Sequence, residues 1–189
     1  MSDVDVTYIE NRVTVAEFGS LPADSQLLLP IATSPGIAQQ RCHHVVVRAF
    51  GALAKGASAK GYRLLVASGH RVRRWPNRAA YEEHLIKRYG SVQEGRKWLA
   101  YASPHETGLV FDLGCHGLKP DSKSAAAQQE TPLHGWLKRE AYLYGFHPYK
   151  PEPWHWEMRI PLYDFGSAPS SQMLCTEDDP DCCEGIDQA

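Results

Sequence analysis

The chain of 189 residues contains no run of 18 or more apolar residues, so its sequence predicts no transmembrane helix. The N-terminal residues carry acidic side chains early and include no apolar h-region, which argues against a secretory signal peptide. We therefore expect a protein that either works in the cytoplasm or leaves it by a route that needs no such signal.

Cysteine is sparse and odd in number. The five cysteines are Cys42, Cys115, Cys175, Cys182 and Cys183. An odd, irregularly spaced set is not the framework of a disulfide-stabilised domain. The adjacent pair near the C-terminus has no CxxC partner that would complete a zinc knuckle. We expect most of these side chains to be free thiols.

The net charge is also small, at −2, but it is unevenly distributed. The last 14 residues hold six acidic side chains and no basic one, whereas residues 60–97 hold ten lysines and arginines against three glutamates. No basic helix and no RNA-binding signature accompanies this cluster, so we expect no nucleic-acid partner.

The length and the ordinary composition indicate a single globular domain with peripheral segments. We expect an N-terminal wrapping segment over 1–33, the folded domain over 34–163 and an acidic C-terminal tail over 164–189. Apolar spacing and capping residues predict helices at 36–55, 77–88, from Ser91 onward and 131–145, strands at 62–67, 109–113 and 155–160, and a long surface loop at 116–130. Helices and strands mixed without strict alternation favour an α+β fold.

Three residues with metal-binding side chains stand in two informative segments. His105 and Asp112 are seven residues apart, and an unbroken strand would separate them by roughly 23 Å and place them on opposite faces. They share a metal ion only if the chain bends between them, and Thr107-Gly108 is the candidate bend. His155 must then come from a neighbouring strand. Catalytic zinc takes about three such ligands and keeps one position open.

The wider motifs carry a resemblance to a known family. Ser103-x-His105-x-x-Gly108-x-x-x-Asp112, followed by Glu152-Pro-Trp-His155, resembles the VanY-type zinc D-alanyl-D-alanine carboxypeptidases of the LAS group of peptidoglycan peptidases. The likeness runs from about Tyr62 to Ile160 and includes Ser68-Gly69-His70-Arg71 and Trp136-Leu137. It implies a small antiparallel sheet that carries the zinc site and is flanked by helices, as in the D,D-peptidase and hedgehog folds.

The resemblance also implies a role for each motif residue. His105, Asp112 and His155 would hold zinc. Glu152 would be the general base that takes a proton from water and passes it to the leaving amine. Arg71 would face the substrate, and Ser103 would contact it at the rim of the site. His70 stands where the family usually has Tyr or Phe, and it stays open between a neutral core histidine and a further substrate contact. The role of Glu157 stays open: it is either a partner of His155 or an alternative general base to Glu152.

The activity that the resemblance implies is zinc-dependent hydrolysis of peptidoglycan stem peptides, with D-alanyl-D-alanine carboxypeptidase favoured. Two alternatives stay open. One is an L-alanyl-D-glutamate endopeptidase acting as an endolysin or as an exported antibacterial effector. The other is a non-catalytic zinc module like the hedgehog signalling domain. The expected partner is the stem peptide, and the expected location is the cytoplasm as made, with export to the cell wall or periplasm by a non-classical route left open.

Overall fold

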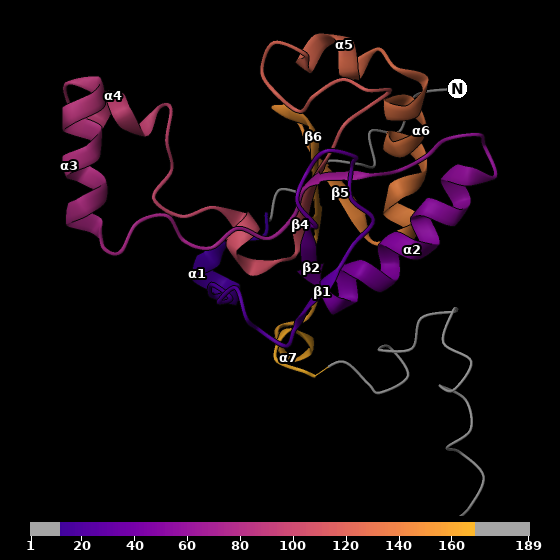
Figure 1. The fold of residues 1–189 in the computed structure, drawn as a ribbon, viewed down its shortest axis with the longest axis horizontal. Coiled ribbons are helices and arrows are strands. Elements are labelled where there is room, and N and C mark those ends of the chain that lie inside the picture. Colours follow the sequence, from indigo (N-terminus) through magenta and orange to yellow (C-terminus); the bar gives the residue numbers. More distant parts are fainter. Residues whose placement is uncertain (1–11, 169–189) are drawn as a thin grey trace, which may run out of the picture.

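The computed structural model describes residues 12–168, so expectations for residues 1–11 and for most of the acidic tail lie outside the described residues. The elements in chain order (Figure 1) are α1 Val15–Phe18, β1 Leu28–Pro30, β2 Arg41–His43, α2 His44–Ser58, β3 Val66–Ser68, α3 Arg78–Tyr89, α4 Val92–Arg96, the 3-10 turn η1 Pro104–Thr107, β4 Val110–Leu113, α5 Ala125–Gln129, α6 Pro132–Glu140, the 3-10 turn η2 Ala141–Tyr144, β5 Phe146–Tyr149, β6 Glu152–Met158 and α7 Leu162–Phe165. Within 12–168 no helix has both the length and the apolar character needed to cross a bilayer.

A four-stranded antiparallel sheet in the order β3-β4-β6-β5 forms the centre of the fold, and β1 pairs with β2 beside it. The helices α2 and α6 lie together on one side of this sheet (Figure 1). Phe111 of β4 packs edge-on against Phe50 of α2 and Phe146 of β5, which ties the helical layer to the sheet. Apolar packing of this kind is the main stabilising contribution in a domain of this size. The predicted α+β class with a small antiparallel sheet is confirmed.

The helix expected over 36–55 is correct only in its second half. Residues 41–43 pair with β1 as a strand, and the helix begins at His44 and continues to Ser58. Ala38 and Cys42 happen to continue the helical spacing, but cross-strand pairing of 41–43 outweighs that local pattern. The expected surface loop over 116–130 likewise contains α5, where the buried Gln128 side chain donates to the Lys119 carbonyl.

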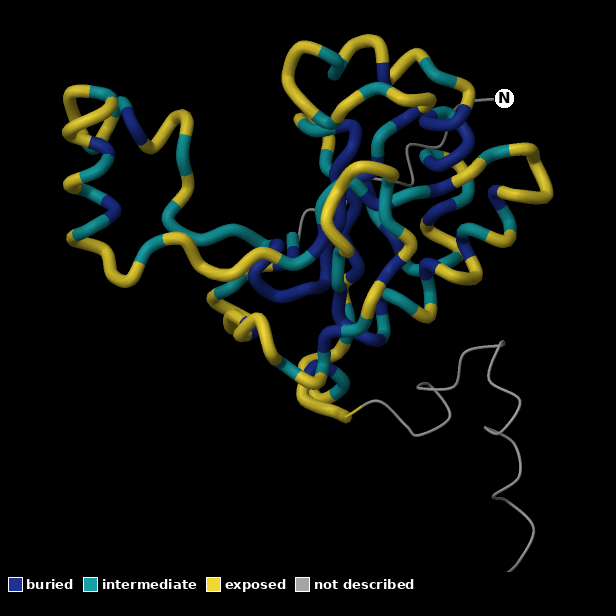
Figure 2. The backbone as a smooth tube through the Cα atoms, viewed as in Figure 1, coloured by how far each residue is buried: buried dark blue, intermediate teal, exposed yellow. Residues whose placement is uncertain are grey.

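The hairpin of α3 and α4 stands apart from the sheet and is mostly exposed (Figures 1 and 2). Asn77 caps α3 by accepting from the Ala80 backbone, and Gly90 ends the helix, both as the sequence predicts. The two helices share a small contact of their own, in which Leu85 packs against Gly95. This arm therefore depends little on the main core.

Two adjacent histidines hold α7, the last helix of the described residues, against the body. His43 Nε2 lies 3.0 Å from the Phe165 carbonyl, and its ring stacks on Phe165 at 5.2 Å. His44 Nε2 lies 2.8 Å from the carbonyl of Ser167. The expected boundary between domain and tail at 163/164 therefore falls inside α7, whose Phe165 is buried. Cys42 is buried beside His43, and it and Cys115 are free thiols, as expected.

Burial of His43 makes stability depend on pH. Burial lowers the pKa of His43 to about 4 against an unfolded value near 6.5, with the Phe165 carbonyl acting in the opposite direction. Between these two pKa values the unfolded chain binds a proton at His43 and the folded state does not. The contribution of neutral His43 to the unfolding free energy is therefore complete above pH 6.5 and is lost as the pH falls toward 4. Between pH 7 and 4.5 we expect wild type to lose about 2 kcal/mol more unfolding free energy than His43→Gln, as measured by urea unfolding. Equal losses in the two proteins would contradict this.

Candidate metal centre and active site

A short 3-10 turn presents His105. Ser103 caps it by accepting from the His105 backbone, and Pro104 occupies its first position. The turn ends at Gly108, which has a φ of +73° and redirects the chain into β4. This is the bend that the seven-residue spacing between His105 and Asp112 requires, and it lies at the predicted place.

The bend can be tested through Gly108→Ala. A Cβ at this position would lie 2.8 Å from Leu28 Cδ2 and 3.0 Å from the His43 nitrogen, in a backbone conformation that costs L-residues about 1–2 kcal/mol. With the added crowding we expect a loss of about 2–4 kcal/mol in unfolding free energy, measured with urea. Gly61→Ala is the matched control, since Gly61 has a φ of +79° but no atom within 4 Å of the added Cβ. Equal losses in the two variants would show that crowding at Gly108 contributes nothing.

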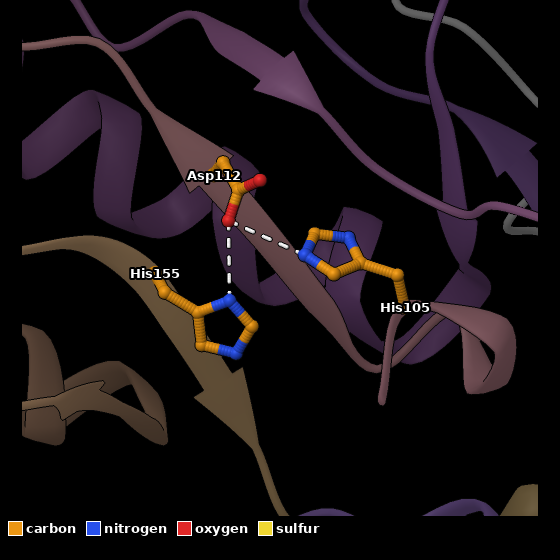
Figure 3. Close-up of side chains that lie close together, drawn as sticks. All are labelled: His105, Asp112 and His155. Carbon is orange, nitrogen blue, oxygen red and sulfur yellow. Dashed lines mark hydrogen bonds and ion pairs between the residues drawn. The ribbon is translucent and has the colours of Figure 1, made fainter. Parts of the chain in front are cut away.

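Three buried side chains from separate elements meet at one point (Figure 3): His105 from η1, Asp112 from β4 and His155 from β6. Asp112 lies directly opposite His155 in the register between the two strands. Asp112 Oδ1 is 3.3 Å from His105 Nε2 and 3.1 Å from His155 Nδ1, and all three candidate ligand atoms lie within 4.8 Å of one another.

These distances fit a metal ion. Two ligands that are each about 2.0–2.1 Å from a tetrahedral zinc lie roughly 3.4 Å apart, close to both contacts of Asp112. The outer nitrogens of the histidines lead to the same conclusion. His105 Nδ1 donates to the Gly69 carbonyl at 2.7 Å, and His155 Nε2 donates to Glu157 at 2.9 Å. A neutral imidazole has one N–H, so with the outer nitrogens donating, each inner nitrogen needs a proton or a metal ion between its lone pair and the Asp112 carboxylate. A single metal ion at that point satisfies all three groups.

The charges of the centre follow from this packing. Burial alone would raise the pKa of Asp112, but the facing nitrogens of His105 and His155 hold it well below its ordinary value. Burial lowers the pKa of His105. The pKa of His155 is raised, because hydrogen bonds to Asp112 and Glu157 outweigh its burial. An ionised carboxylate between two histidine nitrogens is an imidazole and carboxylate donor set that suits zinc.

A cavity of about 580 Å³ opens onto the centre. Its lining includes Arg71, Ser103 and Glu152 together with the three candidate ligands. Arg71 donates to Asp112 Oδ2 at 2.6 Å and to the Ser68 hydroxyl at 2.8 Å, yet half of its side chain stays exposed. The Glu152 side chain is 44% exposed, and its Oε2 lies 3.8 Å from His155 Nδ1. A carboxylate therefore borders the metal-facing nitrogen from the open side of the cavity.

The structure places His70 elsewhere. Its Nε2 lies 2.9 Å from the Leu21 carbonyl, and His70 is not one of the described residues that line the cavity. A substrate contact by His70 stays a prediction, and its observed contact is with the N-terminal segment. The resemblance did not indicate two further residues near His105. The first is the buried Glu106, which accepts from the Ser103 backbone. The second is Arg73, which donates to Glu106, although basic side chains in a cluster such as 60–97 usually face solvent.

Several solved structures are similar to this chain in fold. A solved structure of the LdcB LD-carboxypeptidase, described as revealing the molecular basis of peptidoglycan recognition, is similar at TM-score 0.59 and 22% identity and covers 74% of this chain and 72% of that one. Two structures of the vancomycin-resistance D,D-pentapeptidase VanY, a mutant with Zn(II) and VanYB with D-alanine-D-alanine, have TM-scores of 0.46 and 0.45 at 22% identity. They cover 77% of this chain and 85% and 84% of their own. No curated protein matches the sequence.

The family comparison defines the class of this protein as a peptidase. The family model for VanY, D-alanyl-D-alanine carboxypeptidase, matches residues 39–159, which is more than half of the chain and includes all three candidate ligands. The chain therefore belongs to the VanY family of peptidoglycan peptidases, as its motifs indicate.

Proposed function

We propose that this protein is a zinc-dependent D-alanyl-D-alanine carboxypeptidase that removes the terminal D-alanine from peptidoglycan stem peptides. One observation carries the proposal: two histidine nitrogens converge on a buried carboxylate, and a half-exposed glutamate borders the open side of that centre. His105, Asp112 and His155 would hold the zinc ion. When bound, zinc supplies a polarised scissile carbonyl and water of lowered pKa.

The side chains around the cavity have complementary tasks. Glu152 takes a proton from the attacking water and delivers it to the amine that leaves, and its position beside His155 Nδ1 supports this role. The exposed half of the Arg71 guanidinium binds the terminal carboxylate of the peptide, because its planar fork matches a carboxylate. Ser103 offers a hydroxyl at the rim. Such a substrate places the activity at the cell wall or in the periplasm.

The test uses the zinc-loaded protein and purified muropeptides with pentapeptide or tetrapeptide stems, with products identified by mass. The proposal expects loss of one alanine from the pentapeptide and no change in the tetrapeptide. Loss of alanine from the tetrapeptide alone would show that the enzyme is an LD-carboxypeptidase instead. Cleavage next to the glycan would indicate an L-alanyl-D-glutamate endopeptidase, and stoichiometric zinc without any cleavage would indicate a binding module.

A further inference from the structure

Glu157 is a buried carboxylate with partners on both oxygens. It stands two residues after His155 on β6, so the two side chains share one face of the strand. Its Oε1 accepts from His155 Nε2 at 2.9 Å, and its Oε2 accepts from the Val13 backbone at 2.8 Å. This contact occupies the histidine nitrogen that faces away from the candidate metal centre.

The cation that balances Glu157 is Arg12. Its Nε and Nη2 donate to Glu157 Oε1 at 2.9 and 2.5 Å. Its guanidinium carbon lies 3.3 Å from the centre of the Tyr149 ring, and that ring meets His155 edge-on at 5.7 Å. A buried carboxylate without a cation is costly, so Arg12 allows Glu157 to stay ionised where it binds His155.

An ionised Glu157 determines which nitrogen of His155 faces the centre. Its hydrogen bond occupies Nε2, so Nδ1, which lies 3.1 Å from Asp112 Oδ1, is the nitrogen left to bind a metal ion. Outer partners of this kind commonly orient histidine ligands and raise their basicity. Arg12 holds the carboxylate that holds the histidine, and its Nη2 also lies 3.5 Å from His155 Nε2 at the edge of the cavity.

The N-terminal segment also reaches the other histidine-bearing element. Ser20 donates to Glu106 Oε2 at 2.6 Å, and the Leu21 backbone donates to the Glu106 carbonyl at 2.8 Å. Glu106 directly follows His105 on η1. Residues 12–21 are therefore attached to a buried glutamate beside each candidate histidine ligand. They connect η1, which carries His105, to β6, which carries His155.

We infer that the segment 12–21 is a working part of the metal centre and that Arg12 is a positioning residue, which orients His155 for the metal through Glu157. Arg12 lies outside residues 39–159, where the family model matches, so the family pattern does not supply this contact. The inference concerns the metal site of the proposed peptidase, and its test needs no substrate.

The experiment measures zinc affinity of the full chain by competition with a chromogenic chelator. Arg12→Ala is expected to weaken zinc binding about 10–100-fold, because outer partners of histidine ligands have effects of this size. Arg12→Lys, which keeps the charge and loses the fork, is expected to lie between Arg12→Ala and wild type. Arg159→Ala is the matched control. Arg159 binds Glu17 and the Arg12 carbonyl of the same segment, and it carries no hydrogen bond to Glu157 in the described contacts. We expect its affinity within threefold of wild type.

A second readout separates orientation from folding. In long-range ¹H–¹⁵N spectra, we expect the ring proton of His155 on Nε2 in wild type and in Arg12→Lys. In Arg12→Ala we expect it to be shared between Nε2 and Nδ1. Should Arg12→Ala fail to fold, Arg12→Lys carries the comparison. Affinity within twofold of wild type in Arg12→Lys and Arg12→Ala, or an equal loss in Arg159→Ala, would overturn the inference. Tight zinc binding with no peptide cleavage would instead contradict the proposed function alone.

Discussion

Glu152→Gln is expected to reduce hydrolysis of pentapeptide muropeptides by about 10³-fold while zinc stays bound, because a positioned general base contributes roughly 10²–10⁴-fold. The amide has nearly the shape of the carboxylate but accepts no proton from water. Glu152 is also separate from the three candidate ligands, and its carboxylate lies 3.8 Å from His155 Nδ1. The measurement is kcat for alanine release alongside zinc stoichiometry.

Glu83→Gln is the matched control for this result. Glu83 is an exposed carboxylate on α3, in the helical arm that stands apart from the sheet (Figure 2). Its kcat is expected to equal that of wild type. If Glu152→Gln kept more than a tenth of the wild-type kcat, the general base would have to be sought elsewhere. Glu157 is the poorer candidate, because its carboxylate is buried and bound to His155, Arg12 and Val13.

Asp112→Ala is expected to abolish tight zinc binding and, with it, peptide hydrolysis. This carboxylate contacts both candidate histidine ligands and Arg71, so its loss removes one ligand and the partner of the other two. Changes to outer partners alone cost about 10–100-fold in metal affinity, so we expect the loss of a direct ligand to exceed about 100-fold. Calorimetric titration of the metal-free protein with zinc measures the change.

Asp24→Ala, at an exposed position, serves as the control for Asp112→Ala and is expected to bind zinc as wild type does. If Asp112→Ala bound zinc with an affinity within fivefold of wild type and kept its unfolding free energy, Asp112 would not be a ligand of the centre. The cavity beside His105 and His155 would then need another explanation.

Much of the candidate centre follows from short-range pattern. The spacing from Ser103 to Asp112 contains the cap, the turn and the glycine that bends the chain, so local sequence predicts how His105 approaches Asp112. The approach of His155 is different in kind. It depends on the register of β4 against β6, which is set by packing of both faces. The family resemblance named His155 as a ligand but gave no strand register.

The contacts that the sequence did not indicate are those made over long distances along the chain. Arg12 and Glu157 are 145 residues apart, and neither lies in a pattern that points to the other. The strand at 41–43 was missed for a similar reason, because its pairing with residues 28–30 competes with a helical spacing that reads well locally. Local rules describe turns and caps, whereas contacts between distant segments are decided by the whole packing.

The most direct measurement is a titration of the metal-free protein with zinc while alanine release from pentapeptide muropeptides is followed. A single centre formed by His105, Asp112 and His155 predicts activity that rises with added zinc and reaches its plateau at one zinc per chain. Hydrolysis that is independent of zinc, or one tightly bound zinc per chain without hydrolysis, would contradict the account.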